Sequence, residues 1–201
     1  MSDYKPSADE IKQLRAMTGA GMLNCKNTLV EFKGDVEKAK EDLRKKGLAI
    51  VSKKATRGAK DGLVYAYIHH NGKTGVLVEV NCETDFVARN EEFHELVAEI
   101  AMHIAAKPAS LAITEEDVPR DELEKEKVIH REQAAQTGKP ENVIEKIIEG
   151  KLKKFYSEVC VLNQPWVKDD SKTIQDMINE AVAKMGENIV LRRFARFTIG
   201  E

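Results

Sequence analysis

A basic segment without large apolar side chains, residues 52–62 (SKKATRGAKDG), separates two parts of the chain with different hydrophobic patterns. Before it, apolar residues recur every three or four positions, as on helices. After it, residues 63–82 are rich in Val, Tyr and Ile, as in strands. A segment with nothing to bury indicates a solvated linker. The sequence therefore predicts a first part over 1–52, a linker over 53–62 and a second part over 63–201.

Three short helices are expected in the first part. Apolar side chains at helical spacing mark residues 8–17 and 21–33. Asp35 can cap a third helix, which Gly47 is expected to end. Three helices packed within so short a stretch predict a small helical bundle.

The second part opens with a predicted β-hairpin followed by a helix. Residues 63–70 and 75–82 have the composition of strands, and Asn71-Gly72 between them is a strong hairpin signal. Residues 90–107 place their apolar side chains on one helical face. This amphipathic helix is expected to pack on the hairpin.

Two charged helices follow, near 120–137 and 141–157, separated by Thr137-Gly138-Lys139-Pro140. Their apolar residues can meet along one seam while Lys and Glu cover the outer faces. A protruding helical hairpin is therefore predicted at about 120–157. The next segment, 163–171, is predicted to be a loop.

A last helix over 174–185 and a last strand over 188–199 complete an α+β fold with a three-stranded antiparallel sheet packed with helices. The sheet is predicted to be apolar on both faces. Alternation in the last strand places four apolar residues on one face. These are Ile189, Leu191, Ala195 and Phe197. Helices can cover one face, so a partner is expected to cover the other.

Charge and composition exclude several classes of protein. With 32 basic and 34 acidic residues the net charge is −2, so no global positive field can hold nucleic acid. We expect no direct nucleic-acid partner, although an RNA-binding module remains an alternative. It would use the local basic residues Lys53, Lys54, Arg57, Lys60, Arg192, Arg193 and Arg196.

No apolar run is long enough to span a membrane and the first residues lack a signal peptide, so a cytoplasmic protein without a membrane partner is expected. The three cysteines lie at least 57 residues apart, which predicts neither a disulfide framework nor a metal site. A thiol enzyme is a weak alternative. It would use Cys82 with Glu83, Asp85 and His70.

Residues 81–90, NCETDFVARN, join the second strand to the following helix. Thr84 or Asp85 could serve only as a helix N-cap, with Phe86 as a hydrophobic staple. Alternatively, a short loop on a rigid strand and helix presents a carboxylate beside an aromatic ring to another protein. The sequence leaves both interpretations open.

At these residues the chain resembles translation elongation factor Ts, and the resemblance runs essentially from end to end. Seven pieces in the correct order carry it. They are Ile11 to Lys26 with its Leu14-Arg15 pair, Thr18 to Met22 (TGAGM), 43–47 (LRKKG), 78–90, 147–155 (IIEGKLKKF), 164–167 (QPWV) and the ending GENIVLRRFARFTIG.

The resemblance implies a guanine nucleotide exchange factor that binds GDP-bound elongation factor Tu, disturbs its magnesium and phosphate site, and promotes GDP release during translation elongation. It implies a ubiquitin-associated-like three-helix domain over 1–52, so a ubiquitin-type adaptor is a second alternative. It also implies no bond-making chemistry: no catalytic residue, no cofactor and no metal of its own. Long members of the family carry two core halves and this chain carries one, which suggests a homodimer.

Site residues follow from the same resemblance. Thr84, Asp85, Phe86 and Val87 match the loop that enters the G domain of elongation factor Tu and dislodges its magnesium. Asp85 and Phe86 would carry that action. A second set matches positions where the N-terminal domain touches the G domain. These are Lys12, Arg15, Met22 and Leu23, where Leu23 replaces the methionine common in the family.

Overall fold

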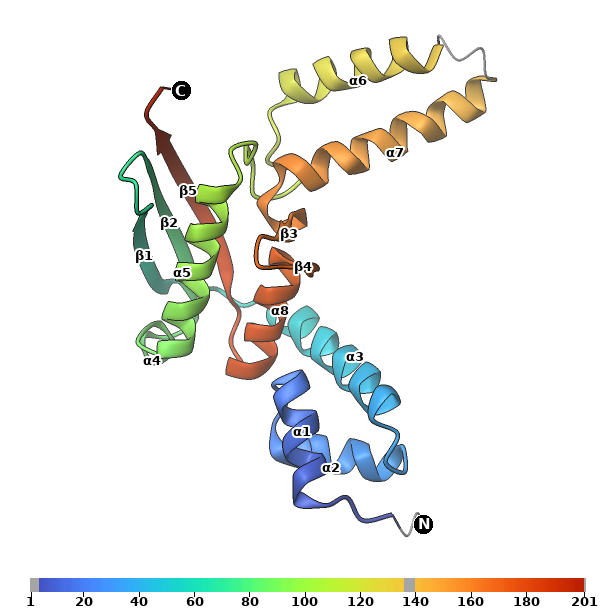
Figure 1. The fold of residues 1–201 in the computed structure, drawn as a ribbon, viewed down its shortest axis with the longest axis vertical. Helices are drawn as coiled ribbons and strands as arrows, with labels where there is room; N and C mark the ends of the chain where they lie inside the picture. The colour runs from blue at the N-terminus through green and yellow to red at the C-terminus, as the bar shows by residue number, and fades with distance from the viewer. Residues whose placement is uncertain (1–3, 136–139, 201) are drawn as a thin grey trace. The chain divides into compact units, whose positions relative to one another are not determined.

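The computed structural model describes residues 4–135 and 140–200, and it confirms a mixed α+β fold (Figure 1). In chain order its elements are α1 (Ala8–Thr18), α2 (Met22–Glu31), α3 (Val36–Lys54), β1 (Asp61–Ile68), β2 (Thr74–Cys82), α4 (Asp85–Ala88), α5 (Glu91–Ala106), α6 (Arg120–Ala135), α7 (Glu141–Val159), a 3₁₀ turn (Val161–Asn163), β3 (Pro165–Trp166), β4 (Asp169–Thr173), α8 (Ile174–Met185) and β5 (Val190–Thr198). The chain divides into two compact units. The first comprises 1–63, 80–96 and 177–190, and the second 64–79, 97–176 and 191–201.

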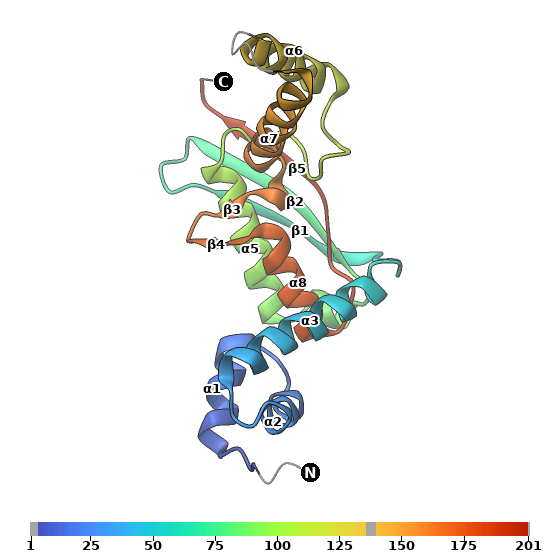
Figure 2. The same ribbon diagram turned by 90° about the vertical axis from the view of Figure 1, so that its right-hand side faces the viewer.

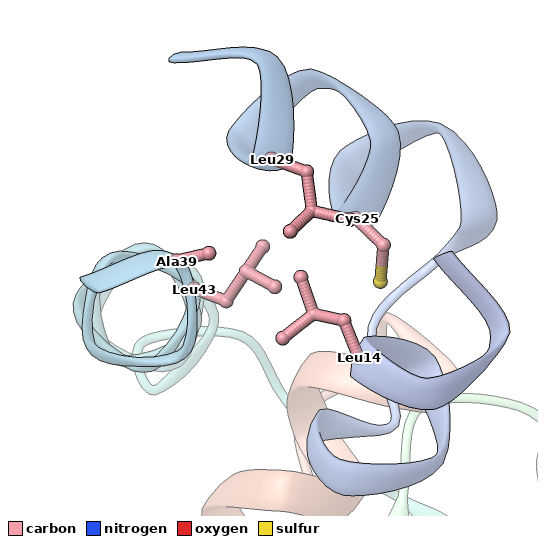
Figure 3. Packing of buried hydrophobic residues seen from close by; sticks show 5 residues of the cluster. All are labelled: Leu14, Cys25, Leu29, Ala39 and Leu43. Atoms are coloured by element: carbon pink, nitrogen blue, oxygen red, sulfur yellow. The ribbon is translucent and has the colours of Figure 1, made fainter. Parts of the chain in front are cut away.

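The first unit holds the predicted three-helix bundle. Side chains from α1, α2 and α3 point toward one another in its core (Figure 3). Leu14, Cys25, Leu29 and Ala39 are fully buried there, and Leu43 nearly so. Burying a leucine side chain contributes about 1.5–3 kcal/mol, so this small cluster accounts for the packing of three short helices.

Local side-chain capping explains where α1 and α3 begin. Ser7 and Glu10 form a reciprocal capping box at the start of α1. The side chain of Asp35 accepts a hydrogen bond from the Lys38 N–H at 3.1 Å, as predicted for the start of α3.

Helix α3 does not end at Gly47 as expected but continues to Lys54. Gly47 faces Ala183 of α8, and its missing Cβ would lie 3.6 Å from the Ala183 Cβ, so a helical glycine fits this contact.

Strands β1 and β2 form the predicted hairpin. Its turn contains Gly72 at φ +67°, a left-handed conformation that glycine adopts without strain, and Asn71 Oδ1 accepts the Lys73 N–H at 2.9 Å. At the other end of β1, Gly62 has φ +141° and lies against β2. A Cβ there would stand 2.2 Å from the Val80 carbonyl oxygen, so only glycine allows this approach.

Strand β5 joins the sheet beside β2, giving the order β1-β2-β5. Arg193 of β5 pairs with Glu79 of β2 at 2.6 Å, and the hydroxyls of Thr198 and Thr74 lie 3.5 Å apart. As residue numbers rise along β5 they fall along β2, so the two strands are antiparallel. Helix α5 runs alongside this sheet in both views (Figures 1 and 2).

The two faces of the sheet in the second unit differ sharply. Val76 and Val78 of β2 are buried. The opposite face exposes a continuous set of apolar residues, hereafter the open sheet face. It comprises Val64, Ala66, Ile68, Leu77, Ala195, Phe197 and Ile199. The predicted face of β5 is not uniformly exposed, because Leu191 is 4% exposed and Phe197 72%. Strict alternation along β5 is lost where Arg192 and Arg193 are both exposed.

Helices α6 and α7 form the predicted helical hairpin. Leu123 of α6 and Phe155 and Tyr156 of α7 pack on a small core at its base, with Cys160 fully buried. The residues Thr137, Gly138 and Lys139, expected to separate the helices, lie outside the described residues. Pro140 stands at the N-cap of α7, where a proline is compatible with a helix start.

The segment predicted to be a loop, 163–171, instead contains the short antiparallel pair β3–β4. Buried polar groups anchor it. The His103 Nε2 and Gln164 Oε1 atoms lie 2.8 Å apart, and Val167 N–H donates to His103 Nδ1 at 3.2 Å. Gln164 Nε2 in turn donates to Ser110 Oγ at 3.0 Å. No local pattern could reveal this pair, because its stability depends on side chains about 60 residues away.

Candidate functional site

The loop from Thr84 to Val87 projects an aromatic side chain into solvent. Thr84 precedes the four-residue helix α4 in an extended conformation, with φ −133° and ψ 157°. Phe86 is 84% exposed, whereas Val87 is half-buried and Ala88 is buried. The loop is thus anchored on one side and presents Phe86 on the other.

Asp85 stands beside Phe86 and is about half exposed. Its Oδ2 lies 3.1 Å from Arg89 Nη2, one helical turn later. An ion pair this open to solvent contributes little stability. A partner could therefore take up the Asp85 carboxylate at small cost to the fold.

The structure argues against a purely local role for these residues. The Thr84 side chain makes no hydrogen bond to its own helix. Its hydroxyl instead donates to Glu187 Oε1 at 2.6 Å. Phe86 is too exposed to serve as a hydrophobic staple, since a staple is buried against the helix that it opens.

Cys82 is not suited to nucleophilic chemistry. Its side chain is fully buried, and its Sγ donates to the Thr84 carbonyl oxygen at 3.2 Å. Burial, with smaller contributions from the charges of Glu187 and Asp61, raises the pKa of this thiol to about 11. A thiol that stays protonated near neutral pH is a poor nucleophile, so the structure favours a structural role for Cys82.

The residues predicted on the N-terminal bundle share the surface of α1 and α2. Lys12 and Arg15 are exposed on α1, and Met22 and Leu23 are exposed at the start of α2. Met17, which the sequence reasoning missed, is also half exposed at the end of α1. Exposed Met and Leu together make an adaptable apolar contact surface.

Several basic residues of the RNA-binding alternative are engaged within the protein. Lys54 Nζ donates to the Gly186 carbonyl oxygen, and Arg57 Nη1 lies 3.5 Å from Glu83 Oε2. Arg193 pairs with Glu79. Lys54, Arg57 and Arg193 of that set are thus partnered within the protein, although Arg57 and Arg193 remain exposed to solvent.

Within the described ranges 4–135 and 140–200, no group of three or more His, Cys, Asp or Glu side chains is arranged to hold a metal ion. In the same part of the chain, no helix combines the length and apolar character needed to cross a bilayer.

Known proteins are similar to this chain over nearly its whole length. The family model of elongation factor Ts matches residues 11–201. Elongation factor Ts of Caldanaerobacter subterraneus subsp. tengcongensis is 59% identical over 195 residues, which cover 97% of each protein. The proteins of the same name from Fervidobacterium nodosum and Geotalea uraniireducens are 58% and 56% identical, over 97% of this chain and 98% and 90% of theirs.

These matches define a class of translation elongation factor. The chain belongs to the elongation factor Ts family. The expected family resemblance is thereby confirmed.

Proposed function

We propose that this protein is a guanine nucleotide exchange factor for elongation factor Tu. It binds the GDP-bound form, disturbs the magnesium and phosphate site, and promotes GDP release during translation elongation in the cytoplasm. It makes and breaks no bond. Family membership supports the partner, and the exposed Phe86 on an anchored loop is the single observation that carries the mechanism.

An aromatic ring that is exposed in the free protein has most of its area available for burial in a partner. Burying a phenylalanine side chain contributes about 1.5–3 kcal/mol. The neighbouring Asp85 carboxylate adds negative charge at short range, where it competes for a cation with the groups that hold magnesium. Asp85 and Phe86 together are hereafter called the wedge, and Thr84 and Val87 flank it in the sequence.

Binding of the factor and of the nucleotide must oppose each other. If the factor weakens GDP binding by some ratio, GDP weakens factor binding by the same ratio. A surface separate from the wedge is then useful for the initial encounter. Lys12, Arg15, Met22 and Leu23 on the bundle provide charged and apolar contacts for that purpose.

Release of labelled GDP from purified elongation factor Tu tests the proposal. The full chain should accelerate release, and Phe86→Ala should lower the accelerated rate about 10- to 100-fold, corresponding to the burial energy of the ring. Leu111→Ala removes another partly exposed apolar side chain and is the matched control. Equal acceleration by the Phe86 variant, or none by the wild-type protein, would reject the proposal.

We also propose that the active form is a homodimer joined through the open sheet face. Several large apolar side chains on this face are each more than 60% exposed; they are Val64, Ile68, Phe197 and Ile199. Monomers rarely leave so continuous an apolar surface in water. The Arg193–Glu79 pair on the same sheet offers both charge signs, so a two-fold partner of identical sequence can match it.

A further inference from the structure

The loop that carries Phe86 is bound by Glu187, a residue of the C-terminal GENIV segment to which neither the sequence motifs nor the family resemblance gave a role. Glu187 lies in the turn between α8 and β5, 103 residues after Thr84. Its Oε2 accepts the backbone N–H groups of Glu83 and Thr84, both at 3.0 Å. Its Oε1 accepts the Thr84 hydroxyl at 2.6 Å. One carboxylate thus satisfies three donors of the loop.

The loop binds the turn in return. Glu83 Oε1 accepts the backbone N–H of Asn188 at 2.7 Å. This bond, with smaller contributions from the charges of Arg57 and Lys54, holds the pKa of the Glu83 carboxyl below its usual value. Glu83 therefore stays ionised near neutral pH. Each of the two segments thus provides a glutamate side chain that accepts a backbone N–H of the other. This arrangement is hereafter called the reciprocal clasp, and it is formed by Glu83, Thr84, Glu187 and Asn188.

The end of α3 and the following linker attach to the same clasp. The Asn188 side chain is nearly buried and its Nδ2 donates to the Arg57 carbonyl oxygen at 2.8 Å. Lys54 Nζ donates to the Gly186 carbonyl oxygen. Gly186 has φ +74°, so the turn that presents Glu187 uses a backbone conformation that glycine favours.

The loop needs support of this kind because its own structure is weak. A helix of four residues is far shorter than one that is stable alone, and α4 lacks a side-chain cap at its start. Hydrogen bonds to an ionised acceptor are about twice as strong as neutral ones. The direction in which Asp85 and Phe86 point is therefore set largely by the carboxylate of Glu187.

We propose that Glu187 is a positioning residue for nucleotide exchange, which acts by holding the loop so that Phe86 is presented in one orientation. This inference rests on the proposed function. In this proposal Glu187 acts through the loop and not by contact with the nucleotide site of the partner. Substitution of Glu187 keeps the Phe86 side chain but removes the hydrogen bonds that fix the orientation of its loop.

The experiment measures GDP release from elongation factor Tu at increasing concentrations of the full chain. Glu187→Ala should lower the maximal stimulated rate about tenfold, the effect of losing charge-assisted hydrogen bonds, with less change in the concentration giving half of that rate. Glu187→Gln keeps the shape and an acceptor oxygen and should restore most of the rate. Glu92→Ala is the matched control, because Glu92 pairs with Lys184 of α8 at 2.6 Å without bonding the loop.

A double-mutant cycle separates positioning from general stability. If Glu187 acts through Phe86, then Glu187→Ala should have little further effect on the maximal rate in a Phe86→Ala background. Additive losses would overturn the proposal. So would an unchanged maximal rate in Glu187→Ala, provided that Phe86→Ala is impaired.

Amide hydrogen exchange of the free protein tests the clasp without any partner. The N–H groups of Glu83 and Thr84 should exchange about tenfold faster in Glu187→Ala, whereas the Val80 N–H in the interior of β2 should not change. Unchanged protection of both loop amides would overturn the proposal. If the wild-type protein failed to accelerate GDP release from elongation factor Tu, the proposed function would be rejected. The amide exchange measurement would still test the clasp.

Discussion

Two exposed phenylalanines show how differently one protein can present an aromatic ring. Phe86 is an isolated apolar group on a short loop, with the charged Asp85 and Arg89 beside it. Phe197 belongs to a flat strand surface and has exposed apolar neighbours on the same sheet. A single ring that projects from a charged loop suits insertion into another protein, whereas a broad apolar face suits burial against a similar face.

The difference also appears in what supports each ring. Hydrogen bonds to the side chain of Glu187 hold the loop of Phe86, and these bonds are directional. The backbone of β5, paired with β2, holds Phe197. A hollow of about 410 Å³ lined by Ile68, Leu77, Phe197 and Ile199 lies on that sheet. The loop therefore presents its ring in a fixed orientation, whereas the sheet face offers mainly apolar area for burial.

Replacing each phenylalanine by aspartate should separate the roles of the two regions most clearly. Phe197→Asp is expected to abolish dimerisation, because a buried unpaired carboxylate costs several kcal/mol. Phe86→Asp should leave the dimer intact and abolish most stimulated GDP release. Sedimentation equilibrium at micromolar concentration measures the first effect. A wild-type mass near 22.5 kDa instead of twice that value would reject the dimer.

A second test asks whether the bundle acts in encounter and the loop in exchange. Leu23→Asp places a charge on an exposed apolar position of α2. We expect about a tenfold higher concentration for half-maximal GDP release, as for loss of one apolar contact, and a nearly unchanged maximal rate. Asn27→Asp, also at an exposed position of α2, adds the same single negative charge without removing an apolar side chain and is the control. A lower maximal rate in Leu23→Asp would assign the bundle to exchange itself.

Asp85→Asn should have a smaller effect than Phe86→Ala. The substitution removes the charge but keeps the shape, and at this exposure a unit charge acts through solvent with an energy of about 1 kcal/mol. The expected loss in stimulated release is therefore about fivefold, and it should shrink at high salt. Arg89→Gln frees Asp85 from its ion pair and should not reduce release. A loss from Asp85→Asn that is insensitive to salt would contradict a charge effect.

Lowering the pH should destabilise the fold through His103 and leave the reciprocal clasp intact. Burial lowers the pKa of His103, so below the ordinary value near 6.5 the unfolded chain binds a proton that the folded protein rejects. Stability should then decrease as the pH falls from 7.5 to 5.5, by at most about 1.4 kcal/mol per unit. The Glu83 carboxyl, with its lowered pKa, should keep the clasp intact over this range.

Urea unfolding at several pH values measures this slope. His103→Gln should flatten it, and His94→Gln, an exposed position on the same helix, should not. An equal slope in the His103 variant would show that another group controls acid stability.

Most of the regular structure follows from local patterns. The spacing of apolar residues predicted the three N-terminal helices, α5 and α8, and Asn71-Gly72 predicted the hairpin, because short-range backbone preferences act over a few residues. The same reasoning failed at Gly47, where packing against Ala183 tolerates a helical glycine. It also failed at 163–171, where the buried Gln164 anchors a short strand pair. At 163–171 a distant contact outweighed the local preference.

By itself, the sequence determined the α+β class, the family and the residues of the exposed loop, since each depends on residue type and order along the chain. Only the tertiary structure decided that Phe86 stands in solvent, that Leu191 is buried whereas Phe197 is exposed, and that Glu187 binds the loop. Burial and hydrogen bonding are properties of groups brought together from far apart in the chain. The three bonds that Glu187 makes across more than 100 residues have no local signature, so folding alone creates them.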